Sequence, residues 1–207
     1  MNASFKNTLK VSVVIVLLLA VALGFWLPRA FRPDPKAIAA AETRMWQAYY
    51  AADPIRLHTE LVTLMQSQFK ASPSEANAIA QRLVMAAWKF ETSSENYEAV
   101  VLPDLEVAFD QIRKLSHRTF DSKEAARAEL AWWVARRTPG QDSAQQVGQK
   151  IGAVYAILYG SDEPGFTEAG VLRAQAGKLR DDSGAGCDWR QVEALLQRSY
   201  QALVEAI

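Results

Sequence analysis

Three glutamates in this sequence each stand one helical turn from a tryptophan. The pairs are Glu42 with Trp46, Glu91 with Trp88, and Glu129 with Trp133. At about 100° per residue, an acid at this spacing shares the apolar face of its helix with the indole ring. A carboxylate on an apolar face needs a partner, because burying an unpaired charge is costly. These acids are therefore the first candidates for chemistry.

Carboxylates from three helices can meet inside a helical bundle and bridge a pair of metal ions. Sites of that kind normally add a Glu-x-x-His motif on two helices, and the chain contains none. The alternative is structural: each acid pairs with an arginine or accepts hydrogen bonds from tyrosine or tryptophan. We favour the structural interpretation, and we expect no metal, no cofactor and no catalytic residue.

Two sets of side chains follow from this interpretation. The candidate buried polar cluster comprises Glu42, Glu129, Glu91, Tyr49, Tyr50, Arg136 and Arg137. The aromatic set, expected in the core or at an interface, comprises Trp46, Trp88, Trp132 and Trp133. The adjacent Trp132 and Trp133 point about 100° apart, so both reach the core only if their helix buries a broad face. We favour a broad face over a flanking or interface position for one of the two rings.

The other reactive side chains are few. His58 and His117 are interpreted as surface or capping residues, since no Cys-x-x-Cys-His signal for haem attachment exists. Cys187 is the single cysteine, so it forms no internal disulfide, and no histidine is placed to activate it. Glycine-rich phosphate-binding motifs are also absent, which leaves nucleotide binding without support.

The elements that must position these residues are helices. Asp53-Pro54 caps and opens a helix over 54–70, after an earlier one over 36–51. Ser72 and Asp121 each begin a capping box that opens a further helix. No stretch alternates with period two, so no strand is expected. The fold class is all-α: one N-terminal transmembrane helix followed by an irregular bundle of about seven helices.

An internal repeat was considered for this helical body. Glu42, Trp46 and Ala48 match Glu129, Trp133 and Ala135 at an offset of 87 residues. Three identities are too few to establish a repeat, and no 34-residue period appears.

The N-terminal stretch predicts a membrane anchor. Residues 11–28 form the expected span, because Val11–Leu27 has Ser12 as its single polar residue. Residues 1–10 are then a short polar tail, 29–36 a proline-containing linker, and 37–207 one helical domain. A cleaved signal peptide is the alternative. Basic residues are nearly balanced across the span, and the short leading tail slightly favours an exported, periplasmic body at the bacterial inner membrane.

Composition limits the classes of partner. Lysine plus arginine and aspartate plus glutamate both number 23, so no global charge attracts nucleic acid. The 50% hydrophobic and 22% charged fractions, over 207 residues, are typical of one folded domain with a tail. We therefore expect the membrane and another membrane or membrane-associated protein as partners, and no nucleic acid. Self-association is left open.

The chain resembles an uncharacterised group of bacterial helical proteins over roughly residues 37–207. The resemblance rests on Ala41–Tyr50, Leu102–Leu105, Glu129–Trp133 and Leu179–Asp181 with Trp189. It implies a helical body and no known activity, so no residue role carries over. Where the group's pattern has a second acid in Glu-Leu-Glu-Trp-Trp, this chain has Ala131, which counts against a metal role for the motif.

These observations lead to one functional hypothesis and two alternatives. The hypothesis is a membrane-anchored helical interaction, accessory or assembly subunit with no catalysis of its own. The first alternative is an enzyme or redox protein that uses Glu42, Glu91 and Glu129, with or without a metal. The second is a haem or lipid binder.

Overall fold

The computed structural model describes residues 34–116 and 118–207, and these residues form nine α-helices, one 3-10 turn and no strand. The helices are α1 (Pro35–Tyr50), α2 (Pro54–Phe69), α3 (Pro73–Thr92), α4 (Tyr97–Val100), α5 (Leu102–Ser116), α6 (Ser122–Arg137), α7 (Ala144–Tyr159), α8 (Pro164–Ser183) and α9 (Trp189–Ala206), with η1 (Gly184–Gly186) before α9. The all-α prediction is confirmed. The predicted number of about seven helices was too low, because the described residues form nine. The short α4 and the glycine-containing α8 are both helical.

Local sequence signals explain where the helices begin. The Asp53 carboxylate accepts a hydrogen bond from the backbone N–H of Arg56 at the start of α2. Ser72 and Glu75 form the reciprocal capping box that their spacing predicts. Asp121 caps α6 through two backbone N–H groups. The first helix begins at Pro35, inside the expected 29–36 linker, because Asp34 caps it and proline is tolerated at the first helical position.

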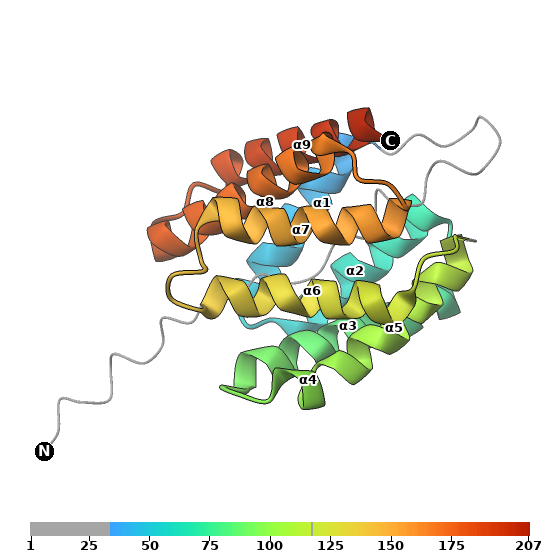
Figure 1. Cartoon of the computed structure of the whole chain (residues 1–207). Helices are drawn as coiled ribbons and strands as arrows, with labels where there is room; N and C mark the ends of the chain where they lie inside the picture. Colours follow the sequence, from blue (N-terminus) through green and yellow to red (C-terminus); the bar gives the residue numbers. More distant parts are fainter. Residues whose placement is uncertain (1–33, 117) are drawn as a thin grey trace, which may run out of the picture.

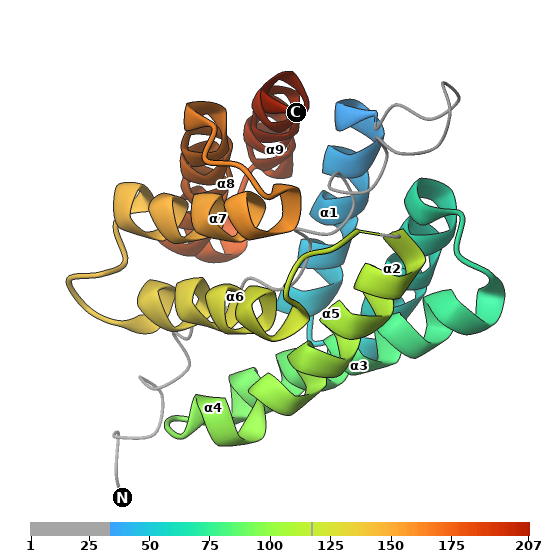
Figure 2. The same cartoon turned by 45° about the vertical axis from the view of Figure 1, so that its right-hand side comes forward.

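Each long helix packs against the next one in the chain, with the short α4 as an addition beside α3, α5 and α6. The contacts run from α1 through α2, α3, α5, α6, α7 and α8 to α9, and α9 then packs on α1. Figure 1 and Figure 2 show α9 beside α1 in two views. The eight long helices therefore form a closed ring of contacts. In this ring, α2, α3 and α5 separate α1 from α6 on one side, and α7, α8 and α9 separate them on the other.

The core is rich in aromatic rings. Trp46, Trp132 and Trp133 are each 1% exposed, so α6 buries the broad face that both of its tryptophans require. Phe90 packs edge-on against Trp133 with ring centroids 5.2 Å apart. Trp88 is the exception among the four candidate tryptophans, because 54% of its surface is exposed.

Three glycines allow α7 and α8 to cross closely. A Cβ atom on Gly170 would stand 2.2 Å from the carbonyl oxygen of Gly148 and 2.8 Å from the backbone nitrogen of Gly152. Glycine weakens an isolated helix. In the folded protein the missing side chain permits backbone contact between the two helices.

The expected span at 11–28, the tail at 1–10 and His117 lie outside the described residues. Among residues 34–116 and 118–207, no helix is long and apolar enough to cross a membrane.

A candidate binding groove above a buried polar cluster

An ion pair lies in the centre of the molecule, between α1 and α8. The Nε and Nη2 atoms of Arg173 donate to the same carboxylate oxygen of Glu42, at 2.9 and 2.6 Å. The hydroxyl of Tyr200 on α9 donates to the other oxygen. None of the three side chains is more than 1% exposed. The carboxylate therefore receives three hydrogen bonds that offset the cost of its burial.

Within this interior triad, Glu42 shifts the pKa values of Arg173 and Tyr200. Burial by itself lowers the pKa of Arg173, but Glu42 together with Tyr200, Tyr155 and Glu129 outweighs that effect, and the net pKa is raised. Burial, followed by the charge of Glu42, raises the pKa of the Tyr200 hydroxyl well above its ordinary value. Arg173 is therefore a cation and Tyr200 a neutral donor at any physiological pH.

Glu129 lies in the same interior but has no arginine bonded to it. One of its oxygens accepts a hydrogen bond of 2.9 Å from the indole nitrogen of Trp133, and its other oxygen has no hydrogen-bond partner among the described residues. Burial raises the pKa of Glu129, and the charge of Arg173 only partly opposes that shift. Glu129 therefore keeps its proton to a higher pH than a solvent-exposed glutamate does. Arg136 and Arg137, its expected partners, bond to other carboxylates.

The two consecutive arginines at the end of α6 reach different helices. Arg137 donates to the Glu91 carboxylate on α3 at 2.6 Å and to the Phe90 carbonyl at 2.6 Å. Tyr49 donates to the same Glu91 oxygen at 2.6 Å. The result is a second triad of tyrosine, carboxylate and arginine, this time half exposed at Glu91.

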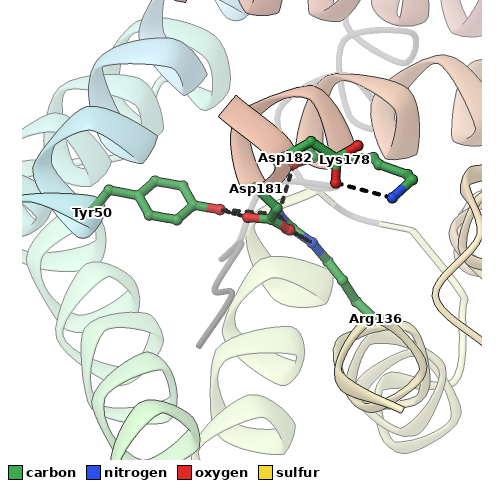
Figure 3. A network of polar contacts seen from close by, with 6 residues as sticks. Tyr50, Arg136, Lys178, Asp181 and Asp182 are labelled. Atoms are coloured by element: carbon green, nitrogen blue, oxygen red, sulfur yellow. Dashed lines mark hydrogen bonds and ion pairs between the residues drawn. The ribbon is translucent and has the colours of Figure 1, made fainter. Parts of the chain in front are cut away.

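The third triad is formed by Tyr50, Asp181 and Arg136. Arg136 donates to Asp181 through two nitrogens, at 3.0 and 2.5 Å, and Tyr50 donates to the other Asp181 oxygen at 2.8 Å. Figure 3 shows the three side chains converging from α1, α6 and α8. A Cβ atom at residue 177 would stand 3.1 Å from the Arg136 guanidinium carbon, so Gly177 makes room for this contact.

Five of the six residues of these two outer triads line a groove of about 960 Å³, and Arg137 is the one that does not. It lies where α1, α3, α6 and α8 end and where α2 and α7 begin, and it is mixed in character. Its apolar wall comes from α2 and α3: Pro54, Leu57, Val84, Ala87 and Trp88. The charged wall comes from α6, α8 and the loop after α6: Arg136, Asp142, Lys178, Arg180, Asp181 and Asp182.

Two features of the groove stand out against the rest of the surface. Trp88 projects from the apolar wall, while Arg180 stacks on the ring of Tyr50, with its guanidinium carbon 3.8 Å from the ring centroid. Lys178 pairs with Asp182 at 3.1 Å across one turn of α8, as Figure 3 shows. Volume, mixed walls and an exposed aromatic ring are typical of a binding site.

The structure separates the three glutamates that stand one turn from a tryptophan. Glu42 and Glu129 belong to the interior, two turns of helix below the groove, and Glu91 belongs to its rim. Among the described residues no group of three or more His, Cys, Asp or Glu side chains could hold a metal ion. His58 is partly buried on α2 and Cys187 is partly buried before α9. Neither residue lines the groove.

Sequence reasoning missed three residues of these triads: Arg173, Tyr200 and Asp181. Glu42 is 131 residues from Arg173 and 158 from Tyr200, so no local pattern links them. One signal was available, because Arg173 stands between Leu172 and Ala174 in an otherwise apolar turn of α8. An arginine on a buried face requires an acid, as the glutamates required a base.

Comparison of the chain with family models, with curated proteins and with solved structures finds no match.

Proposed function

We propose that this chain is a membrane-anchored interaction subunit whose groove binds an amphipathic segment of a partner protein. The observation that carries the proposal is Trp88. An aromatic ring that is 54% exposed, in the wall of a groove, is the type of side chain that dominates binding energy at protein interfaces. Three other tryptophans of the chain are buried in the core, so the exposure of Trp88 is not a general property of the aromatic residues.

The charges around the groove indicate the polar face of the bound segment. Five carboxylates line it against three cationic side chains: Asp53, Glu91, Asp142, Asp181 and Asp182 against Arg136, Lys178 and Arg180. A cleft lined mainly by one sign of charge attracts the opposite sign. The segment that fits best has apolar residues for the Trp88 wall and lysine or arginine beside Asp142, an exposed carboxylate that forms no ion pair with a described residue.

The position of α1 supports a role for an anchor. Tyr49 and Tyr50 are at the end of α1, and Asp34 caps its beginning. Sixteen residues at 1.5 Å per residue place the groove about 24 Å from the start of the helix. An anchor at 11–28 would thus hold the groove away from the lipid surface, open to a partner.

The binding proposal is tested by site-specific photo-crosslinking in the full-length chain. We would place p-benzoylphenylalanine at position 88, and at position 107 as the control, because Val107 is 39% exposed on α5 and does not line the groove. We expect a discrete crosslinked partner from position 88 alone, and the crosslinked peptide should carry apolar residues together with lysine or arginine. Equal products from both positions, or an acidic crosslinked peptide, would sink the proposal.

A second test removes carboxylates from the charged wall and measures the crosslink from position 88. Asp142→Asn combined with Asp182→Asn removes two exposed carboxylates, and we expect the position 88 crosslink to fall. Asp162→Asn with Glu163→Gln, two exposed acids outside the groove, is the matched control and should leave it unchanged.

The anchor is tested separately by alkaline extraction of membranes. We expect the full-length chain to stay in the membrane pellet and Leu18→Arg to move it to the supernatant. A wild-type chain that is extracted by alkali would contradict the anchor without affecting the groove.

A further inference from the structure

The helices of the chain fall into two similar series. The first three, α1, α2 and α3, contain 16, 16 and 20 residues, and α6, α7 and α8 contain 16, 16 and 20. Each series ends in a short turn, α4 or η1, and a further helix, α5 or α9. The packing repeats as well: α1 on α2, α2 on α3 and α3 on α5 correspond to α6 on α7, α7 on α8 and α8 on α9.

The correspondence extends to individual positions. On α1 and α6 the motif Glu42, Trp46 and Ala48 recurs as Glu129, Trp133 and Ala135, and all six residues are buried. The same offset of 87 aligns the tyrosine pair Tyr49-Tyr50 with the arginine pair Arg136-Arg137. The structure adds what three identities could not: equivalent helix lengths, equivalent neighbours and equivalent burial.

The groove shows the same relation on α3 and α8. Val84, Trp88 and Glu91 recur 90 positions later as Ala174, Lys178 and Asp181, and all six line the groove. Leu57 and Val147 on α2 and α7, and Ala52 and Asp142 just before those helices, are related by the same spacing and also line it.

The outer triads join the two series across the groove. Tyr49 of the first series and Arg137 of the second both bond Glu91, while Tyr50 and Arg136 both bond Asp181. Each series therefore contributes one carboxylate, and each carboxylate is held by one residue from α1 and one from α6. This exchange is what an approximate two-fold relation through the groove would produce.

We infer that the described helices form two related halves, each with four long helices, and that the groove between them binds its segment in one direction. Equivalent positions differ in chemistry: Trp88 and Ala52 on the first half correspond to Lys178 and Asp142 on the second. The first half takes the apolar end of the segment at Trp88. The second half takes the end that carries lysine or arginine at Asp142, because Asp142 is exposed and forms no ion pair with a described residue, whereas Asp181 and Asp182 are paired with Arg136 and Lys178. This inference rests on the proposed function and specifies how the bound segment lies.

Direction can be measured with a defined peptide. The probe is a synthetic 14-residue peptide design with leucines concentrated in one half and lysines in the other. Benzoylphenylalanine replaces Ala52 on the first half or Ala185 on the second half of the groove in the full-length chain, which leaves Trp88 and Lys178 intact. We expect position 52 to crosslink the leucine half and position 185 the lysine half, each by about tenfold over the other half.

The decisive variant exchanges the two equivalent residues, Trp88→Lys together with Lys178→Trp. Because both positions are exposed, folding should be unaffected, and circular dichroism checks this. We expect the crosslinking preference to reverse or to disappear. A preference that stays as in the wild-type chain, or a wild-type chain with no preference, overturns the inference while the groove still binds. No crosslink from either position overturns the proposed function as well.

Discussion

Glu42 on α1 and Glu129 on α6 occupy equivalent places in the two halves, yet only one of them meets an arginine. Glu42 bonds Arg173 of α8, whose equivalent on α3, 90 positions earlier, is Leu83. Arg173 and Leu83 are both 1% exposed, so the two halves bury the same position with opposite chemistry. One glutamate is consequently a bonded anion and the other has a raised pKa. The comparison shows that burial of an acid does not by itself indicate an ion pair.

The largest expected effect is that of Glu42→Gln. This substitution leaves the Arg173 cation buried without its counter-ion, and we expect a loss of about 3–5 kcal/mol in the free energy of unfolding. Urea denaturation followed by circular dichroism measures it. A loss below about 1 kcal/mol would mean that the two glutamates are equivalent after all.

Asp181→Asn should come next, with a loss of about 1–3 kcal/mol. The side chain of Arg136 is 9% exposed and would lose its charged partner, although its bonds to Tyr50 and to the Gly177 carbonyl remain. The same denaturation experiment applies. In a double-mutant cycle, the loss for Asp181→Asn combined with Arg136→Met should be smaller than the sum of the two single losses. Losses that simply add would show that the two side chains act independently.

Glu129→Gln should cause no loss at pH 7 and a gain of up to about 1 kcal/mol. Burial raises the folded-state pKa of Glu129, so the native protein holds a proton that the unfolded chain releases. The wild-type stability therefore falls as pH rises from the unfolded pKa, about 4.3, to the folded value. Glutamine cannot ionise and keeps the acceptor for Trp133.

This prediction is checked by denaturation at pH 4 and pH 7. The difference between variant and wild type should be small at pH 4 and should favour the variant at pH 7. A variant clearly less stable than wild type at pH 7 would indicate that Glu129 is an anion with a bonded partner, as Glu42 is.

The smallest effect is expected for Glu91→Gln, below about 1 kcal/mol, because the Glu91 side chain is 37% exposed and water replaces its bonds. Comparison with Asp181→Asn tests whether the two outer triads differ through exposure alone. The difference in melting temperature between wild type and Glu91→Gln should be smaller in high salt than in low salt, because salt screens the exposed ion pair.

Some of this architecture could be predicted from local patterns. The spacing of apolar residues and the capping signals at Asp53 and Ser72 indicated helices, and the structure has them there. Trp88 was expected in the core or at an interface, and it points out of the core, because a 20-residue helix can carry apolar residues on more than one face.

The partners of Arg136 and Arg137 could not be predicted from the sequence, for a different reason. Arg136 and Arg137 are one helical turn past Trp133, so proximity suggested Glu129 as their partner. Tertiary packing directs them instead toward α8 and α3, where Asp181 and Glu91 lie in the last turns of their own helices. Sequence distance carries no information on such contacts, which depend on how the two halves are joined.

The closure of α9 onto α1 has a consequence for synthesis on the ribosome. Glu42 is made early, and the residues that bond it, Arg173 and Tyr200, are translated 131 and 158 positions later. Until then, α1 cannot bury its glutamate as an ion pair. The first half of the chain is therefore expected to stay loosely packed and open to chaperones while the second half emerges, and to consolidate after release of the complete chain.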